Sequence, residues 1–333
     1  MKHWAWTACV AVGAGLVASV PALGAEGTAS TAKPASSRIV VDIKPDRIVL
    51  MDVALAGNRL VAVGERGFAL VSDDEGKTWR AHGTPVDRTL TGVAFKDDKI
   101  GVAVGHGGTV IRTEDGGERW THVPLEEAGP DSLLGVTWLG DDHFVAYGAF
   151  GLYFDSTDAG RNWQRRMVLN EEFDRHISQV VVVGSSLVLV AESGTLLRSD
   201  DGGSTWTEIV SPYQGSYFGA VLTKSGALLV FGMRGNVYRT TDLGTTWTKI
   251  PLDTTVSLMS GKQLSNGTLL LVGNSGLLAD SQDDGQTLKL HWSPQRKGFS
   301  SFAQVGNQVT LVGETGVTAF DPAWLTDSEQ AAR

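Results

Sequence analysis

The sequence is poor in cysteine and in basic residues, and both shortages narrow the range of functions. The only cysteine among 333 residues is Cys9, and it lies in a segment that we expect to be cleaved off. The mature protein would then have no disulfide, no thiolate metal site and no cysteine nucleophile. The sequence contains 28 lysines and arginines and 37 aspartates and glutamates, which gives a net charge of −9. This balance disfavours a general nucleic-acid binder and polybasic membrane attachment.

The sequence also lacks the motifs of several enzyme classes. It contains no Walker loop, no HExxH zinc motif and no GxSxG nucleophile elbow. No apolar stretch after residue 20 approaches the ~20 residues of a membrane-spanning helix. We therefore predict no catalytic, cofactor-binding or metal-ligating residues, and no membrane span in the mature chain.

The N-terminus has the three-part plan of a secretory signal peptide. Lys2 and His3 are followed by apolar or small residues from 4 to 20, and residues 22–25 are mostly small. A membrane anchor is the alternative, but the apolar run is short for a span and contains glycine. We predict a signal peptide over residues 1–25, a flexible polar linker over residues 26–37, and an exported mature protein.

Glycine, in contrast, is abundant, with 41 residues, and much of it belongs to an internal repeat. An eight-residue frame, Ser/Thr-x-Asp-x-Gly-x-x-Trp, occurs five times, and a sixth copy ends in leucine. Its aspartates follow one another at 41, 43, 43, 41 and 41 residues. The aspartates are Asp74, Asp115, Asp158, Asp201, Asp242 and Asp283, and the tryptophans are Trp79, Trp120, Trp163, Trp206 and Trp247.

A second motif, an apolar segment followed by a tight turn that ends in glycine, precedes each octapeptide. Each turn glycine lies seven residues before its aspartate, and a seventh turn, ending at Gly316, has no octapeptide after it. The six turns before octapeptides end at Gly67, Gly108, Gly151, Gly194, Gly235 and Gly276. With the apolar segments between them, each repeat is interpreted as four short strands, which is one blade of a propeller.

We therefore predict an all-β fold, a single seven-bladed β-propeller of four-stranded antiparallel blades over residues 38–322, followed by a tail over residues 323–333. The seventh repeat supplies only three strands. We expect residues 38–43 (Arg-Ile-Val-Val-Asp-Ile) to add the fourth. The N-terminal strand would then close the ring and leave no sheet edge open.

We interpret the octapeptide as structural. Its aspartate sits in a turn between two strands, where the carboxylate can accept backbone N–H bonds. Its tryptophan would pack between blades and bury a large apolar area. A calcium site is the alternative, but no loop continues to a ligand glutamate at calcium-loop spacing, and one aspartate per blade supplies too few oxygens.

This pattern resembles the Asp-box, or bacterial neuraminidase, repeat over about residues 38–322. The repeat is specific for the fold and unspecific for function, since it occurs in sialidases, glycosidases, sortilin-type receptors and photosystem II stability and assembly factors. The last group looks most similar, because it too is an exported single propeller with glycine-ended turns ahead of Asp boxes. The resemblance implies a non-catalytic protein that binds a membrane-protein subunit during assembly, in the periplasm or in a thylakoid lumen.

A glycan-binding or glycan-hydrolysing propeller is the alternative function. A sialidase needs a tyrosine nucleophile paired with a glutamate and an arginine triad that usually begins with Arg-Ile-Pro. The nearest string here is Arg38-Ile39-Val40, and the two tyrosines expected in a loop, Tyr213 and Tyr217, have no glutamate close in sequence. Pairs of carboxylates brought together by the fold stay open from sequence alone.

The strand order predicts where a partner would bind. The glycine-ended turns and the long links between blades should open on one face of the ring, which we call the turn face, and the Asp boxes on the opposite one, the Asp-box face. Arginine and aromatic residues, which are enriched in interface hot spots, gather on the turn face. The candidate partner-binding residues are Arg66, His106, Arg234, Arg175, Tyr213, Tyr217 and Arg296.

Two further expectations concern the arginines. The alternative for the turn face is a solvated surface whose arginines pair with nearby acids such as Asp87 and Asp174. Arg112, Arg198 and Arg239, each three residues before an Asp-box aspartate, are predicted to form a ladder on the outer strands.

Overall fold

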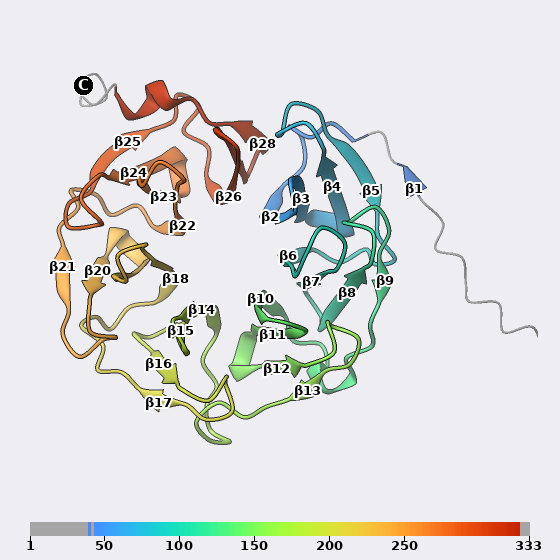
Figure 1. Ribbon diagram of the computed structural model, residues 1–333, viewed down its shortest axis with the longest axis horizontal. Helices are drawn as coiled ribbons and strands as arrows, with labels where there is room; N and C mark the ends of the chain where they lie inside the picture. The colour runs from blue at the N-terminus through green and yellow to red at the C-terminus, as the bar shows by residue number, and fades with distance from the viewer. Residues whose placement is uncertain (1–38, 41–42, 327–333) are drawn as a thin grey trace, which may run out of the picture. The chain divides into compact units, whose positions relative to one another are not determined.

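The computed structural model describes residues 39–40 and 43–326, which form a ring of seven antiparallel sheets (Figure 1). The predicted seven-bladed, all-β propeller is therefore confirmed. The predicted signal peptide (residues 1–25) and linker (residues 26–37) lie outside the described residues, as do residues 327–333 of the predicted tail. Within the described ranges, no helix has the length and apolar character needed to cross a membrane.

Each blade is built from consecutive strands, the first on the channel side and the last on the outer wall (Figure 1). Blades one to three comprise β2 (Leu50–Ala56), β3 (Arg59–Gly64), β4 (Phe68–Ser72) and β5 (Arg80–Gly83); β6 (Leu90–Phe95), β7 (Gly101–Gly105), β8 (Thr109–Thr113) and β9 (Thr121–His122); and β10 (Leu133–Gly140), β11 (His143–Gly148), β12 (Tyr153–Ser156) and β13 (Gln164–Arg165).

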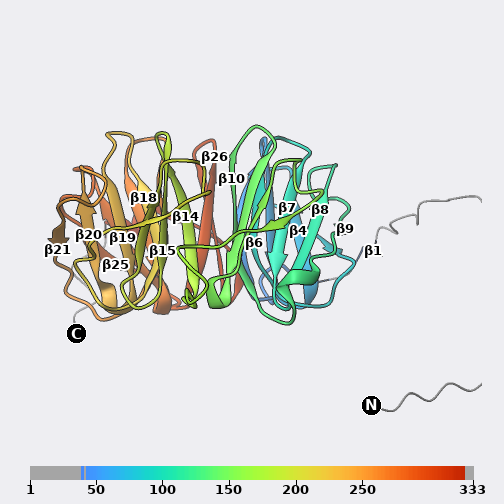
Figure 2. The same ribbon diagram turned by 90° about the horizontal axis from the view of Figure 1, so that it is seen from below.

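The remaining blades repeat this order. They comprise β14 (Ile177–Val183), β15 (Ser186–Ala191), β16 (Leu196–Ser199) and β17 (Thr207–Glu208); β18 (Tyr217–Leu222), β19 (Leu228–Gly232), β20 (Val237–Thr240) and β21 (Thr248–Ile250); β22 (Leu258–Gln263), β23 (Leu269–Gly273), β24 (Leu277–Ser281) and β25 (Lys289–Trp292); and β26 (Phe299–Val305), β27 (Gln308–Gly313) and β28 (Gly316–Ala319). Edge-on, the strands run from one face of the ring to the other (Figure 2).

The core lies between the blades. The middle strands are buried along nearly their whole length, as in β3 and β15, so each sheet has two apolar faces to cover. Neighbouring blades share seven apolar clusters, one at each junction of the ring. Each Asp-box tryptophan packs into the cluster between its own blade and the preceding one: Trp120 between blades two and one, for example, and Trp206 between blades four and three.

The predicted closure by residues 38–43 is wrong for Ile39 and Val40, while residues 38, 41 and 42 lie outside the described residues. Strand β1 (Ile39–Val40) pairs with β5, as a fifth strand on the outer edge of blade one, and the sheet of blade seven has three strands within the described residues. Within the described residues, the backbone hydrogen bond from this segment to β28 is the one that the amide of Val317 donates to the carbonyl of Pro45, at 3.0 Å, while Ile43 packs against the apolar cluster that includes Val317. Proline has no N–H to continue a ladder, and a turn at residues 44–47 redirects the chain at this point.

The junctions beside blade seven are held in other ways. Between blades seven and one, the Ser300 hydroxyl donates to the carbonyl of Leu50 at 2.8 Å, above a shared apolar cluster. Between blades six and seven, the place of the missing Asp-box tryptophan is taken by Trp324, which packs with Phe320 and Leu325 against the cluster. Trp324 belongs to a short 3-10 helix, η6 (Pro322–Leu325), so packed structure extends into the predicted tail.

Trp206→Ala should lower the free energy of unfolding by ~3–5 kcal/mol, because Trp206 is buried against Tyr153 and the facing blade. Trp163→Ala removes the equivalent but only partly buried side chain, so its cost should be smaller. Denaturant titration followed by circular dichroism measures both. Equal losses would show that burial between blades does not set the contribution of these tryptophans.

Candidate partner-binding surface

The turn face carries the glycine-ended turns between the second and third strands of each blade. Four of these turns are 3-10 helices with a left-handed residue at the centre: η1 (Glu65–Gly67), η3 (Ala149–Gly151), η4 (Met233–Gly235) and η5 (Asn274–Gly276). The turn glycine is required by close packing as well as by its positive φ. At Gly67, a Cβ would lie 2.0 Å from the carbonyl oxygen of Val86.

In six of the seven turns the residue before the turn glycine also adopts a left-handed conformation, and in five of these six it is not glycine. Arg66 and Arg234 have φ of 57°, Phe150 has φ of 52°, and the equivalents Ser193 and Ser275 have φ of 55° and 54°. For a residue with a Cβ this conformation costs roughly 1–2 kcal/mol. Such strain persists only where the surrounding structure imposes it. The turns therefore fix the backbone, and with it the direction of the Cα–Cβ bond, at these positions.

Arg66 and Arg234 are exposed, and within the described ranges neither guanidinium makes a hydrogen bond or an ion pair. The arginines around the Asp boxes differ, since their guanidinium groups are bonded to carboxylates. These pairs are Arg59–Asp73, Arg80–Glu118, Arg112–Glu114, Arg119–Asp115, Arg198–Asp200 and Arg239–Asp284. Arg66 and Arg234 thus differ from the arginines around the Asp boxes in having no carboxylate partner within the described residues.

The other predicted binding residues are arranged less uniformly. His106 is exposed, but it lies one residue earlier in its turn than Arg66 does, because Gly107 takes the left-handed position. Arg175 is 3.8 Å from Asp174, a loose contact. Arg296 lies over the ring of Trp292, 5.0 Å from its centroid. The structure thus places all three on the turn face, each in a different setting.

The prediction that Tyr217 contacts a partner is wrong, because its side chain is buried. The first strand of blade five begins at Tyr217, so its side chain is buried between blades four and five. Burial raises its pKa to about 12, and its hydroxyl lies 3.0 Å from Ser211 Oγ. Tyr213 is half-buried and packs edge-on against Tyr217. The tyrosines belong mainly to the core of this junction.

The predicted ladder of arginines on the outer strands is also wrong in its geometry. Arg112 is buried, and its Nε donates to the carbonyl of Ala159 in the next blade at 2.6 Å. Arg239 does the same with the carbonyl of Asp284, at 2.9 Å. Arg198 pairs with Asp200 inside its own blade. Two of these arginines therefore join neighbouring blades.

The Asp boxes use their polar groups internally. In the first, Asp74 accepts the amide of Thr78 at 2.8 Å and its hydroxyl at 2.6 Å, while the hydroxyl of Ser72 donates to Asp74 and accepts the amide of Gly76. The Thr78 bonds lower the pKa of Asp74 to about 2. Hydroxyl donors likewise lower the pKa of Asp201, Asp242 and Asp283 to about 2.

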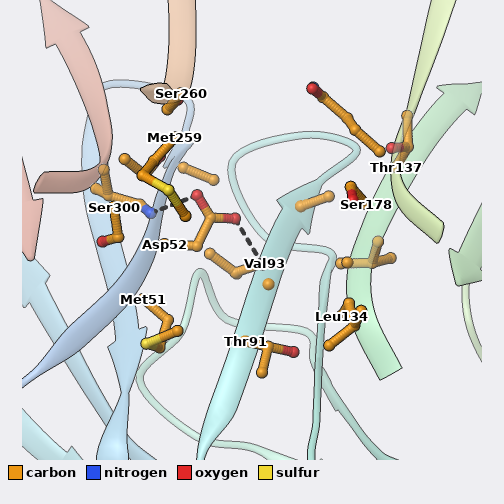
Figure 3. A pocket seen from close by; sticks show the side chains of 18 of the residues that line it. Met51, Asp52, Thr91, Val93, Leu134, Thr137, Ser178, Met259, Ser260 and Ser300 are labelled. Carbon is orange, nitrogen blue, oxygen red and sulfur yellow. Dashed lines mark hydrogen bonds between the residues drawn. The ribbon is translucent and has the colours of Figure 1, made fainter. Parts of the chain in front are cut away.

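Sequence reasoning missed the central channel, a cavity of about 790 Å³ lined by the innermost strands. Each of these strands has a bulge between its first and third residues. In Figure 3, Asp52 of blade one points across to Val93 of blade two, whose amide donates to it at 3.0 Å. Alignment of the repeats could have indicated the channel, because the residues equivalent to Asp52 and Lys262 are small or uncharged in most other blades.

The low pKa of the Asp-box aspartates predicts a loss of stability in acid. Because folding lowers these pKa values from 3.8 to about 2, the charged form favours the folded state. This stabilisation is complete above about pH 4 and is lost as pH falls through 2. The melting temperature should therefore fall between pH 4 and pH 2. Replacing Asp74, Asp201, Asp242 and Asp283 together by asparagine should flatten this slope, and an unchanged slope would assign the acid sensitivity to other carboxylates.

Comparison with known proteins relates this fold to a family. The family model described as "Photosynthesis system II assembly factor YCF48" matches residues 71–262, more than half of the chain. The photosystem II assembly lipoprotein Ycf48 of Synechococcus sp. (strain CC9902) is 28% identical over 141 residues, 41% of this chain and 42% of the relative. The chloroplastic photosystem II stability/assembly factor HCF136 of Arabidopsis thaliana is 24% identical over 158 residues, 45% of this chain and 38% of the relative.

These sequence matches are partial, since each spans only about two fifths of the curated relative. Among solved structures, one described as "YCF48 bound to D1 peptide" covers 86% of this chain and 98% of its own, with a TM-score of 0.68 and 20% identity. At this identity the structural likeness establishes the shared propeller fold.

Proposed function

The chain belongs to the family of the photosynthesis system II assembly factor YCF48, and from this premise we propose that it is an exported, non-catalytic scaffold for the assembly of a membrane-protein complex. Its partner is a polypeptide segment of one subunit, held on the turn face. A relative in this family has been solved with a D1 peptide bound, which supports a peptide as the class of ligand. Export to a periplasm or thylakoid lumen fits relatives described as a lipoprotein and as chloroplastic.

The observation that carries the proposal is the pair of free guanidinium groups at the turn tips. Arg66 and Arg234 are fixed by strained turns, exposed, and without a partner in the described part of the chain. A rigid frame lowers the entropic cost of binding. The planar guanidinium group binds carboxylates through two hydrogen bonds. The turn face is therefore suited to an acidic polypeptide segment.

The alternative, hydrolysis of glycans by a tyrosine nucleophile, is disfavoured by the burial of the tyrosines. Tyr147, Tyr153, Tyr217 and Tyr238 are buried, and burial raises the pKa of each phenol. A phenol with a raised pKa is harder to ionise and makes a poorer nucleophile. Tyr213, the remaining tyrosine, packs against Tyr217 and Tyr238.

Replacing both arginines by glycine separates binding from folding. Arg66→Gly with Arg234→Gly removes the guanidinium groups and relieves the left-handed strain, because glycine adopts positive φ freely. The melting temperature should stay the same or rise. Co-purification of the partner subunit from a detergent extract of membranes should fall at least tenfold relative to the unchanged protein.

The matched control is Ser193→Gly with Ser275→Gly, the same backbone change at two equivalent turns. This variant should co-purify the partner as the unchanged protein does. If the arginine variant keeps its partner while folding normally, the turn tips are not the binding site.

A further inference from the structure

The Asp-box end of the central channel has an apolar rim. The sixth residue of the innermost strand is apolar in five successive blades and glutamine in blades six and seven. We call the five apolar residues the apolar mouth: Leu55, Phe95, Trp138, Val182 and Leu222. Because innermost strands run from the turn face to the Asp-box face, the mouth opens on the side opposite Arg66.

Three of the five residues of the apolar mouth are exposed, whereas Phe95 is buried between blades one and two. Leu55, Trp138 and Val182 retain 38%, 39% and 36% of their accessible surface. Large apolar residues exposed singly are common, but Leu55 and Trp138 also line the channel, and Val182 occupies the equivalent position of blade four. Apolar patches of this kind mark binding sites. The indole N–H of Trp138 donates to the carbonyl of Asp141 at 3.0 Å, so its polar group is already used.

The two glutamines that complete the circle need no ligand. Gln263 accepts the amide of Lys224 at 2.6 Å and donates to the carbonyl of Gly267 at 2.8 Å. Gln304 accepts the amide of Ser265 and donates to the carbonyl of Gly306. Beside them lies a second cavity of about 250 Å³, whose lining shares Leu55 and Lys262 with the channel. Lys262 is the one charged residue among those that line this smaller cavity.

The ammonium group of Lys262 is incompletely bonded. It donates to the carbonyl of Phe302 and lies 5.6 Å from the centre of the Phe302 ring, and these are its contacts in the described ranges. An ammonium has three N–H donors. Burial lowers the pKa of Lys262, although the charge of Asp52 acts in the opposite direction. Asp52 itself is occupied by the amides of Val53 and Val93.

We propose that the apolar mouth and Lys262 form a binding site for a small amphiphile with an apolar chain and a carboxylate head, of the kind represented by a medium-chain fatty acid. The carboxylate pairs with the Lys262 ammonium through charge-assisted hydrogen bonds, and the chain covers Leu55, Trp138 and Val182. A channel volume of about 790 Å³ lies in the ~300–1,000 Å³ range of ligand pockets. This site is separate from the turn face and does not rest on the proposed function.

Decanoate below its micelle concentration is the probe, and isothermal titration calorimetry is the measurement. We expect one decanoate per chain, and at least tenfold weaker binding of decanol, which lacks the charge. Lys262→Met should weaken decanoate binding at least tenfold. Its fold should persist, because removing a poorly solvated charge is usually tolerated, and the melting temperature checks this.

Two matched controls locate the site. Lys224→Met removes an exposed lysine on the same face and should leave decanoate binding unchanged. Leu55→Ser with Val182→Ser should weaken binding at least tenfold, whereas Val210→Ser, at an exposed valine in the link between blades four and five, should not.

The proposal is overturned if the unchanged protein does not bind decanoate, if decanol binds as tightly, or if folded Lys262→Met binds normally. An acetylated peptide Ala-Leu-Leu-Leu with a free carboxylate is the last arm. Tighter binding of this peptide than of decanoate would replace the fatty acid by a polypeptide C-terminus as the occupant.

Discussion

Burial of apolar surface between neighbouring blades is the constraint on which the rest of the structure depends. Each sheet has two apolar faces, so a blade alone would leave both in water, and only a closed ring covers all of them. The seven junction clusters satisfy this requirement. Trp324 shows how strict it is: where the repeat supplies no Asp-box tryptophan, a residue from the C-terminal 3-10 helix fills the junction.

Packing in a ring gives the two faces different tasks. On the Asp-box face, carboxylates bind their own turns, and Arg112 and Arg239 donate to the backbone of the next blade. Polar groups bonded in this way hold the fold together. Few unbonded polar groups are then left to contact a partner at the outer part of this face. On the turn face, glycine and close packing fix the backbone of the turns. The side chains of Arg66 and Arg234 are therefore not needed to hold the fold together.

The repeat could be predicted from the sequence because the spacing of glycine and aspartate is a local property of each blade. Prediction from the sequence failed where the burial or hydrogen bonding of a residue depends on neighbouring blades. Tyr217 lies in what the sequence presents as a link, yet it starts an innermost strand and is buried. Arg112 repeats in register with Arg198, yet only Arg112 reaches the next blade. The position of the closing strand was predicted wrongly because a turn at residues 44–47, which contains Pro45, redirects a segment whose own pattern favours a strand.

The geometry of the ring also limits the size of the ligand that each of its two faces can bind. Arg66 and Arg234 stand on blades one and five, so a ligand that touches both has to extend across the ring, as a polypeptide segment does and a small molecule does not. At the opposite end of the channel, Leu55, Trp138 and Lys262 line one cavity, and Val182 is exposed at the equivalent position of blade four. Convergent side chains around a narrow opening favour a compact or thin ligand. The two proposed sites thus differ in their chemistry, and neither follows from the fold alone.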